Sequence, residues 1–149
     1  MPDIWFYHLE RTPIHQVLPD LLEKVTQKGW RAYVHGLDDD MIEGLNAQLW
    51  AYRSDSFLAH GLETEDMAER QPVLLGASGV MINRPDVYMS VSPLELPDVS
   101  ALQRCLLVFE GSNDEHLVWA RGQWKRMKAD GCDLAYWKQN ELGRWEKIQ

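Results

Sequence analysis

The chain has 149 residues, of which 45% are hydrophobic and 26% charged, a composition typical of a folded globular domain. Its 23 acidic and 15 basic residues give a formal net charge of -8, which disfavours a protein that coats duplex DNA over its whole surface. No signal-peptide pattern or long apolar run is visible, and the two cysteines, Cys105 and Cys132, lack metal-ligand spacing. We therefore expect a cytoplasmic protein with reduced thiols, no bound metal and no membrane contact.

The first third of the chain predicts two strand–helix pairs. Residues 3–9 are aromatic and branched and indicate a strand. A helix follows up to Gly29, with apolar residues at spacings of three and four and Thr12 as its expected N-cap. A second strand over 30–37 precedes another amphipathic helix over about 41–50. This β–α–β–α opening is typical of a parallel sheet with crossover helices.

The rest of the chain continues the alternation of strands and helices. Residues 50–69 are less regular and indicate a short strand followed by an exposed acidic loop. We then expect three strands, a last helix and a final strand, over residues 72–77, 87–92, 104–110, about 113–129 and about 132–138. No internal repeat or long linker divides the chain, so residues 1–149 predict a single domain. The predicted fold class is α/β, a three-layer Rossmann-like domain with a mostly parallel central sheet flanked by helices.

Two segments raise the hypothesis of a nucleotide- or phosphate-binding enzyme. The acids at 38–40 follow a strand and precede a helix, where they serve either as a magnesium site or, more commonly, as a helix cap. The turn at 76–79 has two glycines but matches neither phosphate-loop motif. His8 and His35 lie in the first two predicted strands, where they are either a catalytic pair on neighbouring strands or, more commonly, structural histidines; the histidines have no zinc spacing. The sequence therefore predicts no catalytic residue and no cofactor.

Charge is distributed unevenly along the chain. Residues 1–112 hold 17 acids and 8 bases, whereas residues 113–149 hold 6 acids and 7 bases. On the last predicted helix, Arg121, Lys125 and Lys128 fall within an arc of about 60° at 100° per residue. The helix therefore predicts a cationic stripe on an otherwise acidic protein.

An apolar arc that includes Leu117 and Trp124 borders this cationic stripe. One interpretation is a solvated helix face with cations near the C-terminal end of the helix dipole. A second is a site for a short acidic ligand with an apolar end. A third is a single-stranded nucleic-acid-binding module, since aromatic rings stack on bases, although the net charge of -8 disfavours it.

Large apolar residues also gather in the irregular segment after the second helix. Leu49 and Trp50 are followed by Phe57, in a region without clear periodicity. These residues are explained either as core or as an aromatic patch for a permanent protein partner.

Four short segments together resemble a known family. They are Phe6-Tyr7, Leu49-Trp50, Ser56-Phe57 and the pattern Ala120-Arg121-x-x-Trp124-Lys125-x-x-Lys128-x-x-Gly131-x-x-Leu134. This ordered set, which spans nearly the whole chain, resembles the chi subunit of bacterial DNA polymerase III, a small accessory protein of the clamp-loader complex. The resemblance implies a single Rossmann-like α/β domain that is a non-catalytic replisome adaptor and reaches DNA only indirectly.

The resemblance also implies two partners. One is the acidic, Phe-ended C-terminal tail of single-stranded-DNA-binding protein (SSB). The other is the psi subunit, which tethers the family to the clamp loader. For psi, the family's aromatic pair falls on Trp50 and Phe57 of this chain.

For the SSB tail, the resemblance assigns roles to the last helix and strand. Arg121 is the expected clamp for the tail's carboxylates, and Trp124 stands where the family often has a tyrosine and walls the Phe pocket. The other expected tail-binding residues are Lys125, Lys128, Leu117 and Leu134. Leu117 replaces a lysine of the family, so the acid contact there is expected to be weaker or relocated. The segment after Gln139 is longer than in the family's best-known members.

Overall fold

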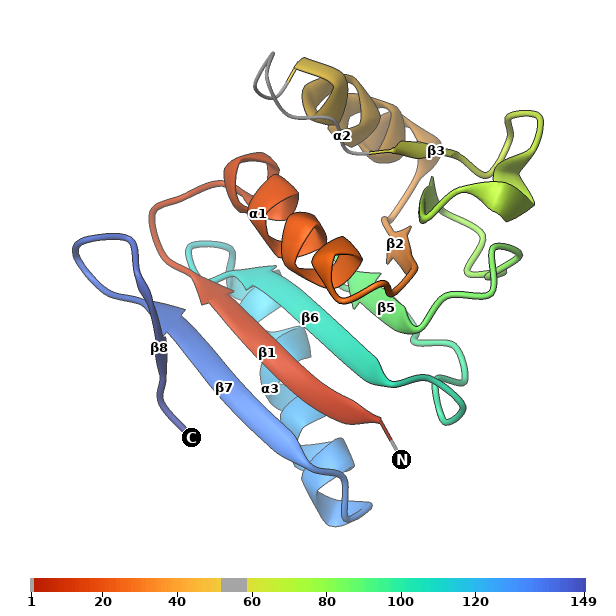
Figure 1. Cartoon of the computed structure of the whole chain (residues 1–149). Coiled ribbons are helices and arrows are strands. Elements are labelled where there is room, and N and C mark those ends of the chain that lie inside the picture. The colour runs from red at the N-terminus through yellow and green to blue at the C-terminus, as the bar shows by residue number, and fades with distance from the viewer. Residues whose placement is uncertain (1, 52–58) are drawn as a thin grey trace.

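The computed structural model describes residues 2–51 and 59–149. Within these residues a single sheet has the strand order β3-β4-β2-β5-β6-β1-β7-β8 (Figure 1). The strands are β1 Asp3–Leu9, β2 Ala32–His35, β3 His60–Leu62, β4 Val73–Gly76, β5 Val87–Ser90, β6 Arg104–Glu110, β7 Leu134–Gln139 and β8 Trp145–Lys147. The helices are α1 Ile14–Gln27, α2 Asp39–Ala51, the 3-10 helix η1 Ala68–Arg70 and α3 Asp114–Ala129.

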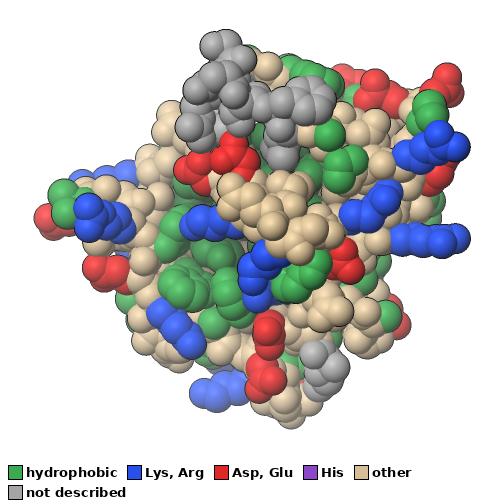
Figure 2. Space-filling model, in the orientation of Figure 1, with side chains coloured by type: hydrophobic (Ala, Val, Ile, Leu, Met, Phe, Trp, Pro, Cys, Tyr) green, Lys and Arg blue, Asp and Glu red, His purple; other side chains and the backbone are tan. Residues whose placement is uncertain are grey.

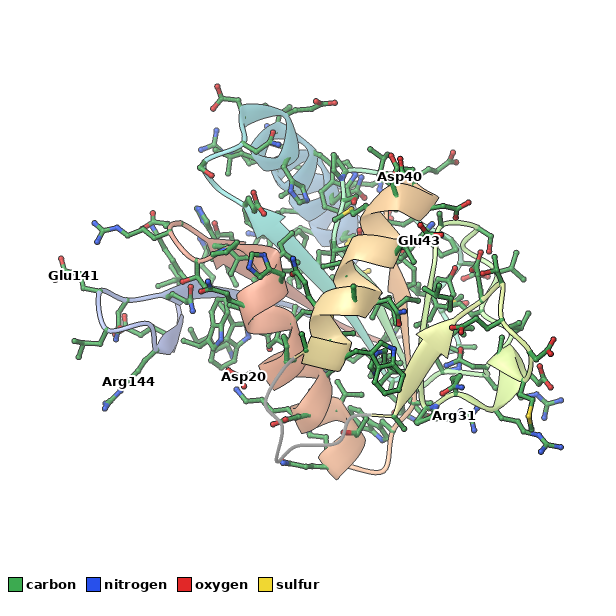
Figure 3. All side chains as sticks on the ribbon, turned by 90° about the horizontal axis from the view of Figure 1, so that it is seen from above. Asp20, Arg31, Asp40, Glu43, Glu141 and Arg144 are labelled. Atoms are coloured by element: carbon green, nitrogen blue, oxygen red, sulfur yellow. The ribbon has the colours of Figure 1, made fainter. Side chains whose placement is uncertain are left out.

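The sheet is parallel except at one edge, where β8 runs antiparallel to β7. Helices α1 and α2 lie together on one face and α3 lies on the other, as the view from above shows (Figure 3). The prediction of a three-layer α/β fold with a mostly parallel sheet is confirmed. In the same view the labelled Glu141 and Arg144 project from the β7–β8 hairpin, which the sequence did not predict.

Each face of the sheet has its own hydrophobic core, because successive side chains of a strand point to opposite sides. On β1, Phe6 points to the α3 face and Tyr7 to the α1 face. On β7, Tyr136 and Trp137 divide in the same way. The strands β1, β6 and β7 therefore supply side chains to two separate surfaces.

The helix starts show which local predictions were correct. Asn113 precedes α3, and its Oδ1 accepts a hydrogen bond from the backbone N–H of His116 at 3.1 Å. Asp38 precedes α2, and its Oδ1 accepts from the N–H of Met41 at 2.9 Å. The prediction of Thr12 as the cap of α1 is wrong, because Pro13 occupies the cap position and no side chain caps that helix.

His8 and His35 do not lie on neighbouring strands, which excludes a catalytic pair of these two residues. His8 lies on β1 and His35 on β2, and β5 and β6 separate these two strands in the sheet. Each ring instead bonds to a tyrosine hydroxyl: His8 to Tyr136 and His35 to Tyr88. Of the helices within residues 2–51 and 59–149, none has the length and apolar character to cross a membrane.

Candidate functional site

A pocket of about 370 Å³ lies between α3 and the sheet. Its floor consists of three aromatic side chains, Phe6, Phe109 and Tyr136. They come from β1, β6 and β7, which are adjacent in the sheet, and all three belong to the core on the α3 face. The floor therefore exists because the parallel strands bring residues distant in sequence to one side.

Helix α3 forms the wall of this pocket. The lining residues of the helix are Leu117, Ala120, Arg121, Trp124 and Lys125. The Trp124 ring meets Phe6 edge-on, with ring centroids 5.2 Å apart, and meets Tyr136 edge-on at 5.9 Å. Ala120 is buried, and its small side chain leaves room between the helix and the floor. The result is an apolar pocket with fixed aromatic walls.

The charged side chains of the pocket are all cationic. Arg121 and Lys125 are exposed at its rim, and within the described part of the chain no acidic side chain lines it. Among the residues that the structure describes, neither Arg121 nor Lys125 makes a hydrogen bond or an ion pair. The two cations are therefore available to an anionic ligand whose apolar part enters the pocket.

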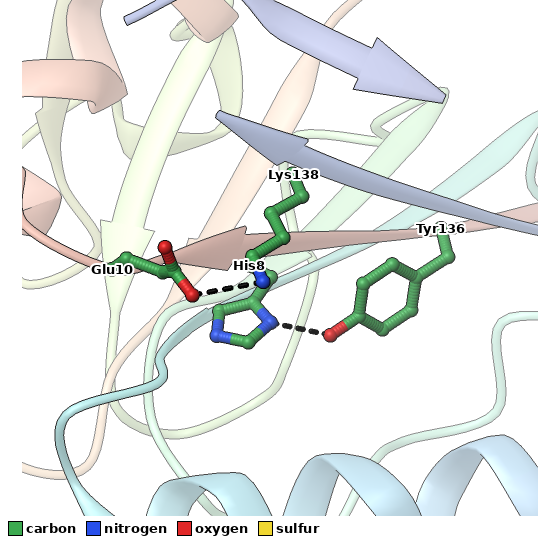
Figure 4. A network of polar contacts seen from close by, with 4 residues as sticks. All are labelled: His8, Glu10, Tyr136 and Lys138. Carbon is green, nitrogen blue, oxygen red and sulfur yellow. Dashed lines mark hydrogen bonds and ion pairs between the residues drawn. The ribbon is translucent and has the colours of Figure 1, made fainter. Parts of the chain in front are cut away.

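A polar network holds the floor in place beside this rim (Figure 4). The hydroxyl of Tyr136 bonds to Nδ1 of His8, and Lys138 forms an ion pair with Glu10 at 2.8 Å. Burial lowers the pKa of His8, and the positive charges of Lys138 and Arg121 lower it further. His8 rests against Gly111, where an added Cβ would lie 2.0 Å from its Nε2. A neutral imidazole thus fixes the position of the Tyr136 ring.

The structure brings together four of the six residues that were expected to bind the tail. Leu117, Arg121, Trp124 and Lys125 all line the pocket. Lys128 and Leu134 do not line it: Lys128 is exposed in the last turn of α3, and Leu134 packs against the core on that face. The lining residues that sequence reasoning missed are Phe6, Phe109, Ala120, Tyr136 and Gln149.

The family assignment comes from comparison with known proteins. A family profile described as "DNA polymerase III chi subunit, HolC" matches residues 1–135, which include β1, β6 and all of α3. The chain belongs to the DNA polymerase III chi subunit family. The match ends within β7, so Tyr136, the β7–β8 hairpin and Gln149 lie beyond it.

Two curated relatives carry the same description. A DNA polymerase III subunit chi of Pseudomonas aeruginosa is 33% identical over 82 residues, which are 55% of this chain and 56% of that protein. A probable DNA polymerase III subunit chi of Rickettsia prowazekii is 22% identical over 156 aligned positions, covering 99% of this chain and 93% of that protein. The chain thus matches little more than half the length of the Pseudomonas protein and nearly all of the Rickettsia one.

Of the aromatic pair expected to bind psi in the chi family, Trp50 lies near β3, at the edge of the sheet opposite to β8. Trp50 is 58% exposed near the end of α2, and its ring centroid lies 4.3 Å from that of His60. Leu49 is buried in the core. Phe57 lies outside the described residues. An exposed tryptophan on a helix end favours the partner interpretation for Trp50 over the core interpretation.

The two segments that raised the enzyme hypothesis serve structural roles in this chi-family chain. Asp38 caps α2. At the turn after β4, the Glu63 carboxylate accepts hydrogen bonds from the Tyr33 hydroxyl at 2.6 Å and from the N–H and hydroxyl of Ser78. A carboxylate already fills the turn and would repel a phosphate. No group of three or more metal-ligating side chains occurs in residues 2–51 and 59–149.

Proposed function

We propose that this chi-family chain is a non-catalytic replisome adaptor in the cytoplasm. It holds the acidic C-terminal tail of SSB in the pocket beneath α3 and links it, through psi, to the clamp loader. The observation that carries the proposal is the combination of an aromatic floor with two unpaired cations at the rim. This combination suits a peptide that ends in an apolar residue and carries carboxylates.

In this proposal each part of the pocket has its own task. The partly exposed side chains of Leu117, Trp124 and Tyr136 line the space that an aromatic side chain would fill, and the buried rings of Phe6 and Phe109 lie behind them. Arg121 stands at the rim, where its planar guanidinium can pair with a carboxylate through two parallel hydrogen bonds. Lys125, one turn later on the helix, adds a second positive charge for the acids that precede the apolar end.

The test is isothermal titration calorimetry of the chain with a peptide that ends in Asp-Asp-Ile-Pro-Phe. Arg121→Ala should weaken binding by at least about tenfold, because a hydrogen bond to a charged group contributes about 1.5–3 kcal/mol. Lys125→Ala should weaken it less, since a lysine pairs without the bidentate geometry. Lys128→Ala should have the smallest effect of the three, because Lys128 lies outside the pocket lining.

Arg126→Ala is the matched control. Arg126 is an exposed arginine of the same helix, but it bonds to Gln123 at 2.6 Å and does not line the pocket. The Arg126→Ala variant should therefore bind the peptide with the same affinity as the unaltered chain. Equal weakening by Arg121→Ala and Arg126→Ala would mean that only net charge matters, and the assignment of the pocket would then be incorrect. A peptide ending in Ala in place of Phe should also bind weakly if the aromatic floor is used.

The link to psi is tested separately at Trp50. We expect Trp50→Ala to reduce co-purification with psi, because an exposed tryptophan at an interface is commonly a centre of binding energy. The same variant should keep its affinity for the tail peptide, since Trp50 is not part of that pocket. If Trp50→Ala retains psi fully, the psi contact lies elsewhere on the chain.

A further inference from the structure

A second aromatic groove lies on the face of the sheet opposite to α3. It has a volume of about 310 Å³ and runs between α1 and the strands β1 and β6. Three cations line it, Lys24, Lys28 and Arg104, and no acidic side chain of residues 2–51 and 59–149 does. Figure 2 shows hydrophobic side chains gathered in a hollow on this face, with Lys and Arg side chains beside it. The groove is thus locally cationic on a protein whose net charge is -8.

The cations and the rings of this groove are interleaved. The guanidinium of Arg104 lies 3.8 Å from the ring centroid of Trp5 and 5.1 Å from that of Trp30. The Nζ of Lys28 lies 4.9 Å from the centroid of Trp30. The Arg104 guanidinium therefore contacts two indoles, and the exposed Lys28 ammonium lies over one of them.

The aromatic surface continues from the groove toward β8. Trp137 on β7 lies 5.5 Å from Trp5 and is nearly parallel to Tyr7, with an interplanar angle of 15°. Trp145 on β8 meets Tyr7 edge-on at 4.9 Å. The four tryptophans of this surface are only partly buried. Accessible indole surface therefore extends in a row from the groove to β8.

We propose that this groove binds single-stranded DNA, with bases against the exposed indoles and phosphates near the three cations. Single strands are held by positive grooves with interleaved aromatic rings, because every base has a flat face that can stack. Charge complementarity supports a polyanion here, since the lining has three cations and no acid. DNA rather than RNA follows from the membership of the chain in a DNA polymerase III subunit family.

This proposal does not rest on the SSB-tail site. Phe6 and Tyr136 serve the α3 pocket, whereas their neighbours Tyr7 and Trp137 serve the groove on the other face. The two sites are therefore separated by the thickness of the sheet, and a ligand in one leaves the other open. A chain that held an SSB tail on one face could hold the adjacent DNA strand on the other.

The test measures fluorescence anisotropy of a labelled oligothymidylate of about 12 nucleotides, a length within the usual site sizes for single strands. The full chain should bind it at about 50 mM salt. With three phosphate contacts, each contributing about 0.7 to the salt slope, binding should weaken roughly 20-fold at about 200 mM. Duplex DNA of the same length should bind much more weakly, because its bases are already stacked.

Two charge-matched double variants separate the groove from net charge. Lys24→Glu with Lys28→Glu alters two exposed side chains of the groove and should weaken binding about tenfold or more. Arg70→Glu with Arg126→Glu makes the same change in net charge at exposed positions outside both sites, and should stay within about twofold of the unaltered chain. Circular dichroism confirms that each variant is folded.

Further variants decide between the two faces. Trp145→Ala should weaken binding about fivefold or more if its ring stacks on a base. Lys125→Glu with Lys128→Glu, on α3, should leave oligonucleotide binding within about twofold.

Loss of binding in this α3 variant alone would place the DNA on the opposite face and overturn the proposal. No binding at low salt, or equal loss in both charge-matched variants, would overturn it as well. So would self-association of the chain that Trp145→Ala abolishes, since a second copy would then be the occupant.

Discussion

The two faces of the sheet use the same strands to build different surfaces. On the α3 face, the helix packs across β6 and β7 and closes over the aromatic residues beneath it. On the α1 face, the helix packs on β2 and β6, so the aromatic residues of β1 and β7 stay partly open. The same alternation of side chains thus produces a roofed pocket on one side and an open groove on the other.

The pocket and the groove are lined by charges of the same sign, whereas a third region is lined by charges of the opposite sign. Both the pocket and the groove are lined by cations without acids. Near β3 and α2, a smaller cavity of about 50 Å³ is lined by Asp39, Glu43 and Glu63 and by no cation. Cationic and acidic side chains therefore line separate regions of the fold, and the net charge of -8 does not predict the local charge of either cationic surface.

The largest expected effect tests how two neighbouring residues of β1, one facing each core, differ in burial. Phe6 is fully buried beneath Trp124, so Phe6→Ala should lower the free energy of unfolding by about 3–5 kcal/mol. Its neighbour Trp5 is partly exposed and rests on Arg104, so Trp5→Ala should lower it by about 1–2 kcal/mol. Urea unfolding at pH 7 measures both. Equal losses would mean that Trp5 is packed as closely as Phe6.

A second difference between the faces is their response to acid. His116 on α3 is 3% exposed, and burial lowers its pKa to about 4. In the unfolded chain the same group titrates near its ordinary 6.5, so the unfolded state takes up the proton first as the pH falls. Stability should therefore be lost between about pH 6.5 and pH 4, with a total of about 2–3 kcal/mol from this residue.

His116→Asn measures that loss directly. An asparagine oxygen can replace the Nδ1 that accepts the N–H of Glu110, and it does not titrate. The variant should therefore show a flatter dependence of stability on pH, by urea unfolding at pH 7 and at about pH 4.5. His15→Asn, at an exposed position on α1, is the control and should follow the unaltered chain. An unchanged slope in His116→Asn would assign the acid sensitivity to His8 and His35, whose pKa values burial also lowers.

The sequence predicted those parts of the fold whose signals are local. The last helix was expected over about 113–129 and is α3, Asp114–Ala129, because an asparagine cap and apolar spacing lie within one short segment. The strand expected at 104–110 is β6, because its apolar run is long and continuous. The rim of the pocket was expected for the same reason, since Arg121 and Lys125 follow from helical periodicity alone.

The floor of the pocket could not be predicted in that way. Phe6, Phe109 and Tyr136 are far apart in the sequence, and only the strand order β6-β1-β7 brings them together. The short strand β8 was missed because its pairing depends on the free edge of β7 rather than on its own residues. The order of strands likewise decides that His8 and His35 lie on strands that are not adjacent.

The smallest expected effect concerns the N-terminal caps of α3 and α1. Asn113→Ala removes the side chain that caps α3 and should lower the free energy of unfolding by about 1 kcal/mol. Thr12→Ala should change it by at most a few tenths of a kcal/mol, because no side chain caps α1 and Pro13 occupies that position. Urea unfolding at pH 7 resolves this difference, and Asn113→Asp should restore most of the loss because aspartate also caps helices well. A loss of about 1 kcal/mol in Thr12→Ala would instead mean that Thr12 caps α1 in solution. A side-chain cap would then stabilise the first turn of α1 as it does the first turn of α3.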